Sequence, residues 1–153
     1  MVQKATDVKP KMDVKLTMDE LRYISLFQDI TGVTPKDCIV SEDLNLVVFV
    51  VDSDKLGQAI GRRGGNVKYV SKVIGRDIEV VGWAEDLKDF VKNIFMPARV
   101  YRVQLIDGRD KKVLYVYVDP KDKGLAIGKN GRNVTKARVL LNRYFAIGNV
   151  VIM

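Results

Sequence analysis

Two short segments flanked by glycines are the part of the sequence best suited to chemistry with a ligand. Each has two polar residues between its glycines: Gly61-Arg62-Arg63-Gly64 and Gly128-Lys129-Asn130-Gly131. Glycine has no Cβ and readily adopts positive φ, so such a loop can turn sharply and let a ligand backbone approach closely. A helix that begins after the loop adds free N–H groups and a positive dipole end, which favour phosphate. The pattern therefore predicts two phosphate-binding loops.

Basic side chains surround both loops. No acidic residue lies between positions 55 and 76, and Asp122 is the only one between 121 and 143. Residues four apart share a helix face, so the helix after each loop should present two cations on a face distinct from its apolar stripe. The predicted contacts are Arg62, Arg63, Lys68 and Lys72 at the first loop, and Lys129, Asn130, Arg132 and Lys136 at the second, with Lys55, Arg76, Lys121, Lys123, Arg138 and Arg143 nearby.

The elements that must hold these loops occur twice along the chain. Hydrophobic periodicity predicts helix, strand, strand, helix, helix, strand over about 17–82 and again over 83–153. Thr17 to Glu20 has the spacing of a capping box, which starts the first helix, with Leu21 at the head of its apolar stripe. Residues 1–16 carry several lysines without a period, which predicts a partly ordered basic tail. The expected fold class is α+β, with two tandem copies of a three-stranded sheet packed against helices.

The two copies match residue by residue around the loops. Ala59-Ile60-Gly61 corresponds to Ala126-Ile127-Gly128, and at the same offset Gly64, Asn66 and Val67 correspond to Gly131, Asn133 and Val134. For one loop alone, glycines that only connect helices beside a solvated charged surface would be an equal explanation. Two loops with the same neighbours favour duplication of a functional unit.

Composition excludes several classes of function. The chain has a net charge of +7 and an isoelectric point near 9.5, which favours an anionic partner such as nucleic acid. It has no histidine, so the commonest general base and metal ligand are missing; we expect no enzyme, metal or cofactor. Its single cysteine, Cys38, lies in an apolar run and should be a buried thiol. No apolar segment suits a signal peptide or a membrane span, so we expect a cytoplasmic protein with no membrane contact.

The residues from 59 to 67 and from 126 to 134 resemble KH-domain signatures, and the element order resembles the type II KH fold. The tandem pair, the Asn-Val after each loop and the junction Trp83-Ala84-Glu85-Asp86 resemble archaeal NusA, a family of transcription elongation and termination factors. The resemblance implies domains at 17–82 and 83–153 that pack rigidly and bind single-stranded RNA, each Gly-x-x-Gly loop clamping four nucleotides. It covers the KH modules and neither the polymerase-binding nor the OB-type domain of bacterial NusA. We expect the bases to lie on apolar grooves near Ile60, Val67 and Ile78, and near Ile127, Val134 and Ile147.

Other functions remain open at this point. The spacing of the glycines argues against a nucleotide hydrolase. Gly124 and Gly128 have three residues between them, whereas a P-loop has four, and Asn130 stands where a P-loop has Ser or Thr. A ribosome-associated KH protein that binds ribosomal RNA would use the same loops, so RNA polymerase and ribosomal components are both candidate partners. A basic scaffold for acidic proteins is a third candidate. Residues 83–153 hold 14 basic and 7 acidic residues, against 12 and 12 before them, so the second module should attract RNA more strongly over distance.

Overall fold

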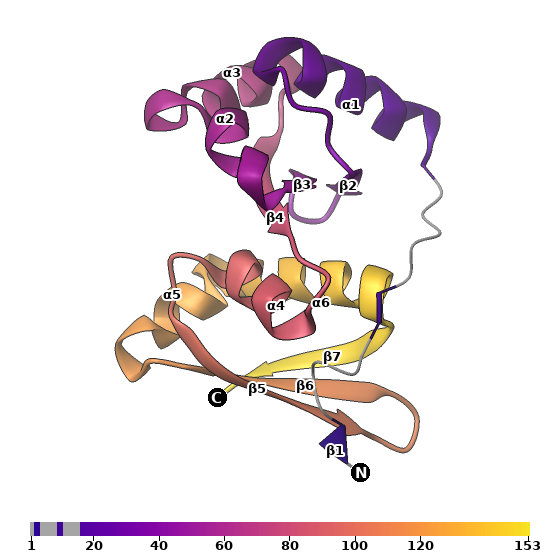
Figure 1. The fold of residues 1–153 in the computed structure, drawn as a ribbon, viewed down its shortest axis with the longest axis vertical. Coiled ribbons are helices and arrows are strands. Elements are labelled where there is room, and N and C mark those ends of the chain that lie inside the picture. Colours follow the sequence, from indigo (N-terminus) through magenta and orange to yellow (C-terminus); the bar gives the residue numbers. More distant parts are fainter. Residues whose placement is uncertain (1, 4–8, 11–15) are drawn as a thin grey trace. The chain divides into compact units, whose positions relative to one another are not determined.

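The computed structural model describes residues 2–3, 9–10 and 16–153, which form two compact units (Figure 1). The first unit holds residues 16–83 of this set, and the second holds residues 84–153 together with the short strand β1 (Val2–Gln3). The division falls after Trp83, one residue beyond the position expected from the sequence. Each unit has the order helix, strand, strand, helix, helix, strand, so the predicted α+β fold with two tandem copies is confirmed.

The first unit has one sheet with helices on one face (Figure 1). Its central strand is antiparallel to the strand before it and parallel to the last strand, giving the order β2-β3-β4. Thr17 caps the first helix as predicted, since its hydroxyl accepts a hydrogen bond from the Glu20 N–H at 3.2 Å. The elements are α1 (Met18–Thr31), β2 (Asp37–Ser41), β3 (Leu46–Asp52), α2 (Leu56–Ile60), α3 (Gly65–Ile74) and β4 (Asp77–Trp83).

The core of this unit lies between its sheet and helices. Phe27 of α1 stacks on Phe49 of β3, with 4.2 Å between ring centroids, and Cys38 is fully buried as expected. Val70 places the middle of α3 in the same core. Leu21 is 46% exposed, so its assignment to the apolar stripe of α1 was wrong. The helix therefore packs through its C-terminal half, where Phe27 and Thr31 are buried.

The second unit repeats the arrangement with one added strand. Its sheet has the order β1-β5-β6-β7, in which β5 and β6 are antiparallel, β6 and β7 are parallel, and β1 pairs antiparallel with β5. The sequence did not predict β1, because two residues are too short to show a period. Residues 1, 4–8 and 11–15 of the predicted tail lie outside the described ones. The elements are α4 (Leu87–Phe95), β5 (Val100–Asp107), β6 (Lys112–Val118), α5 (Lys123–Ile127), α6 (Arg132–Phe145) and β7 (Ile147–Ile152).

The helix after the second loop is longer than its counterpart. α3 has 10 residues and stops at Gly75, whose φ of 81° ends it in the left-handed conformation. α6 has 14 residues and continues to Ala146, which takes the same conformation at φ 56°. No helix in the described part of the chain is long and apolar enough to cross a membrane.

Candidate functional site

The two Gly-x-x-Gly loops have the same backbone conformation. Gly61 has φ 77° and ψ 170°, and Gly128 has 79° and 167°. The third residue of each loop, Arg63 or Asn130, is left-handed at φ 55° or 57°, and the last glycine follows at 72° or 75°. Corresponding angles in the two loops agree within 3°. The match in sequence is thus a match in three dimensions.

An asparagine just inside the following helix braces the first glycine of each loop. Asn66 Nδ2 donates to the carbonyl of Gln58 at 3.0 Å, and Asn133 Nδ2 donates to the carbonyl of Leu125 at 2.9 Å. A Cβ on Gly61 would lie 2.8 Å from Asn66 Cγ, closer than real Cβ atoms approach. The sequence comparison matched these asparagines but gave them no role. Their role is to tie the short helix before the loop to the helix after it.

The last glycine of each loop faces open space instead. A Cβ on Gly64 or on Gly131 would meet no protein atom within 4 Å. Their positive φ values require glycine for conformational reasons, and the absence of a side chain also leaves the loop backbone accessible. This is the geometry that lets the backbone of a ligand come close to loop N–H groups.

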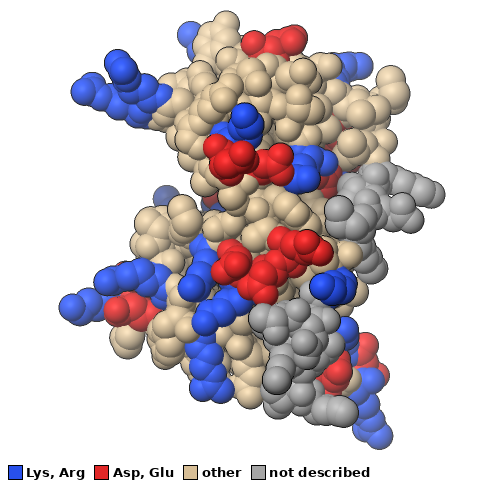
Figure 2. Space-filling view, viewed as in Figure 1, with Lys and Arg blue, Asp and Glu red and all other residues tan. Residues whose placement is uncertain are grey.

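The loop tips carry exposed polar side chains. Arg62, Arg63, Lys129 and Asn130 are exposed, and among the described residues no acidic group pairs with the three cations. Arg63 has a left-handed backbone conformation. This conformation is unfavourable for a residue with a Cβ and costs about 1 kcal/mol. Figure 2 shows Lys and Arg side chains projecting from the part of each unit where Figure 1 draws α2 and α5. Lys68 and Lys72 of α3 are exposed as predicted, and Arg132 is half-buried.

A groove lies next to the second loop and joins it to the edge strand β7. Its volume of about 360 Å³ is in the range of about 300–1,000 Å³ typical of ligand pockets. Four predicted residues meet in it, and five that the sequence analysis had not placed there complete its walls. The predicted four are Ile127, Asn130, Gly131 and Val134; the others are Thr135, Arg138, Val150, Val151 and Ile152.

Four predicted positions are buried, and one of them, Val134, is 7% exposed and still lines the groove. Lys136 is only 5% exposed, so its assignment to an exposed face of α6 was wrong; the period of a helix gives direction but not what packs against it. Ile78 and Ile147 are 8% and 1% exposed, so the grooves expected beside them do not include these side chains as open surface. In the first unit, Ile60 and Val67 are half-buried next to the loop, as is Ile127 in the second unit.

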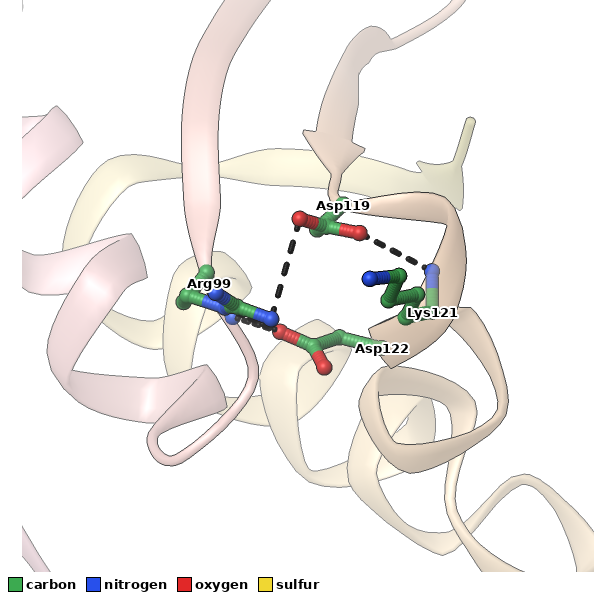
Figure 3. A network of polar contacts seen from close by, with 4 residues as sticks. All are labelled: Arg99, Asp119, Lys121 and Asp122. Carbon is green, nitrogen blue, oxygen red and sulfur yellow. Dashed lines mark hydrogen bonds and ion pairs between the residues drawn. The ribbon is translucent and has the colours of Figure 1, made fainter.

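Asp122, the acidic residue that the sequence places beside the second loop, is paired with a cation within the protein (Figure 3). Asp122 Oδ2 accepts hydrogen bonds from the Arg99 backbone N–H at 3.0 Å and from Arg99 Nε at 2.9 Å. Asp119 accepts from the Lys121 backbone N–H at 3.0 Å and also faces Arg99. These hydrogen bonds lower the pKa of Asp122 below its usual value, with the Arg99 side chain as the main cause. The pairing fixes the turn before α5 and places the Asp122 carboxylate against a cation of the protein itself.

The first unit also has an ion pair near its loop, and this pair reduces the positive charge available there. Arg76 Nη2 lies 3.1 Å from both carboxylate oxygens of Glu42, and this contact raises the pKa of Arg76. The sequence analysis had counted Arg76 among the cations near the first loop. Because its charge is balanced by Glu42, the positive surface there depends on Arg62, Arg63, Lys68 and Lys72.

Comparisons with known proteins agree with this architecture. A model of the NusA-like second KH domain matches residues 87–150, and a KH domain model matches residues 21–84. The probable transcription termination protein NusA of Methanococcus vannielii is 34% identical over 93% of this chain and 81% of its own. The protein of the same description from Halococcus morrhuae is 35% identical over 91% of this chain and 98% of its own. The crystal structure of APE1850 aligns with a TM-score of 0.83 at 41% identity, over 90% of this chain and all of that one.

Fold, loops and family models together define a protein with two tandem KH domains. The relatives match most of the chain at 34% and 35% identity, so the chain belongs to the NusA family. This confirms the resemblance noted in the sequence, and it agrees with a binding protein rather than an enzyme.

Proposed function

We propose that this chain binds single-stranded RNA through both Gly-x-x-Gly loops and acts in transcription termination or antitermination. The observation that carries the proposal is the shared backbone of the two loops, whose last glycines open toward solvent. KH domains use this loop to clamp four nucleotides of a single strand. The relatives are described as probable transcription termination proteins, which favours this role over ribosome association.

In the proposed complex, the loop and the groove have different tasks. Loop N–H groups, with Arg62, Arg63 and Lys129, hold phosphates, while Asn130 donates a neutral hydrogen bond. Phosphate contacts position the strand without reading its sequence. The bases lie against the apolar side chains beside each loop, such as Ile127 and Val134 in the second unit, where the groove also carries polar groups that can select among bases.

Charge reversal at the first loop tests the clamp. Arg62→Asp with Arg63→Asp should abolish binding at the first module, since exposed loop tips contribute little to the core. A matched control, Arg22→Asp with Lys92→Asp, changes the net charge equally at exposed positions of α1 and α4. Fluorescence titration with labelled RNA, on variants shown to be folded by circular dichroism, compares them. Equal affinity of the loop variant and the control would refute the loop assignment.

The salt dependence of binding gives a second measurement. On single strands, the logarithm of the affinity falls by about 0.7 per logarithmic unit of salt for each neutralised phosphate. The loop variant should therefore lose a slope of about 1.4 for its two arginines. A wild-type affinity that does not change with salt would contradict the electrostatic clamp.

The cellular role needs a separate test. Crosslinking of RNA to the chain in cells, followed by sequencing, should recover nascent transcripts near termination sites. Co-purification with RNA polymerase would support the proposed role. Recovery of ribosomal RNA and ribosomal subunits would instead favour the ribosome-associated function.

A further inference from the structure

We propose that the second unit has an additional RNA subsite, beyond the Gly-x-x-Gly groove, where Arg138, Arg143 and Lys111 hold the phosphate of a further nucleotide. The inference rests on the proposed function, because it extends the same RNA path. It makes the two modules unequal in the length of RNA that they bind.

The structure has a second hollow along α6, next to the groove already described. It is lined by Arg138, Val139, Asn142, Arg143 and Gly148. Arg138 belongs to both hollows. The two hollows therefore meet at Arg138, where a strand that leaves the groove could continue along α6.

The extra turn of α6 creates this hollow. At the offset that aligns the two loops, Gly75 corresponds to Asn142, so α3 stops where α6 continues for four more residues. Four residues lengthen a helix by about 6 Å, which is comparable to one nucleotide step of an extended strand. Asn142 Nδ2 donates to the Ile147 carbonyl at 3.2 Å and holds this turn against β7.

Arg138 stands at the junction of the two hollows. It is exposed, and its Nη2 donates to the Val150 carbonyl at 3.3 Å, which fixes the guanidinium at the edge of β7. A guanidinium has five N–H donors, and this contact uses one. The corresponding residue of the first unit is Ser71, whose hydroxyl donates to the Arg76 carbonyl at 2.7 Å. The residue of the first unit that is equivalent to Arg138 is thus uncharged.

Lys111 brings a third cation to the hollow from the β5–β6 turn. A Cβ added to Gly148 would lie 2.5 Å from Lys111 Cβ and 2.8 Å from its Cδ. The methylene chain of Lys111 therefore lies against Gly148, which is one of the residues that line the hollow.

The chemistry of the lining selects a phosphate as the occupant. Arginine binds phosphate through paired N–H groups, and lysine adds a compact charge. Val139, which is 38% exposed, offers an apolar surface beside them for a sugar or a base. Continuity with the groove favours the next nucleotide of a bound RNA over a separate acidic peptide.

The test measures how affinity grows with RNA length. It uses the full chain with Arg62→Asp and Arg63→Asp, so that binding reports the second unit, and oligouridylates of about four to eight nucleotides, starting from the four of a single clamp. Affinity should rise beyond four nucleotides. Arg138→Ser, which copies the first unit, or Lys111→Ser should remove that rise. The loss of one phosphate contact corresponds to about eightfold at 50 mM salt and about fourfold at 150 mM. Arg109→Ser, in the same turn as Lys111, is the matched control and should keep the rise.

The outcomes separate this inference from the function on which it rests. A wild-type chain that binds no oligonucleotide would overturn the proposed function itself. Binding of tetranucleotides with a length effect that survives both Arg138→Ser and Lys111→Ser would overturn the subsite and leave the loops intact. Competition by oligoglutamate as strong as that by RNA of equal charge would assign the hollow to an acidic protein and also overturn the proposal.

Discussion

The two glycines of each loop should respond differently to the same substitution. Both Gly61 and Gly64 have positive φ, yet only Gly61 is closely surrounded by protein atoms. Gly61→Ala should destabilise the first unit strongly. Gly64→Ala should destabilise it weakly and impair RNA binding, because the added methyl group enters the space through which a ligand backbone approaches.

The magnitudes follow from backbone conformation and packing. At φ 77° and ψ 170°, Gly61 lies in a region almost restricted to glycine, where another residue costs about 1–3 kcal/mol. The new Cβ would also displace Asn66 and break its hydrogen bond to Gln58, which adds about 1 kcal/mol. Gly64 is in the ordinary left-handed region, where alanine costs about 1–2 kcal/mol. Either alanine regains about 0.4–1 kcal/mol from the less flexible unfolded chain, and this gain cancels between the variants. The difference in stability between the two variants should be about 1.5 kcal/mol.

Urea unfolding followed by tryptophan fluorescence gives the stability of the first unit. Trp83 is the only tryptophan and lies at the end of β4, so it reports on that unit. RNA titration of the folded variants then gives the second readout. Equal loss of stability for Gly61→Ala and Gly64→Ala, or unchanged RNA affinity for folded Gly64→Ala, would refute the reasoning.

Three further predictions concern the supports of the loops. Asn66→Ala and Asn133→Ala should each cost about 1 kcal/mol in urea unfolding and weaken RNA binding by one module, whereas unchanged binding would make the brace purely structural. Thr17→Ala should cost about 1 kcal/mol through loss of the helix cap and leave RNA titrations unchanged. Asp122 has a lowered pKa, so its pair with Arg99 should stabilise the fold fully above about pH 4 and progressively less as the pH falls toward that lowered value. The difference in thermal midpoint between wild type and Asp122→Asn should shrink over that interval; a constant difference would contradict the pairing.

The sequence predicted the loops and the order of elements because both depend on local spacing. Glycines three apart, an asparagine two residues later and apolar residues at helical intervals are visible without knowing any tertiary contact. Their recurrence at a constant offset made the duplicated fold the economical explanation, and the structure confirms the two copies. Even the capping of α1 by Thr17 was predictable, since its partner lies three residues away.

The features that the sequence missed depend on partners distant in the chain. Lys136 corresponds by offset to Tyr69, yet Tyr69 is 57% exposed and Lys136 only 5%. Equivalent positions on the two helices therefore face different surroundings. Arg138 enters the groove because its guanidinium reaches the Val150 carbonyl, twelve residues further on. No period or spacing in the sequence encodes that contact.

Net charge and local charge answer different questions about the two modules. The excess of basic residues over 83–153 predicts that the second unit attracts RNA more strongly at a distance. Once RNA is bound, only charges within a Debye length of about 8 Å act strongly at physiological salt. At that range the first loop has two tip arginines and the second has one lysine. If Arg138 and Lys111 extend the RNA path, they restore to the second module contacts that its milder loop tip lacks. The two modules would then hold RNA through cations in different places, the first at its loop and the second along its longer helix.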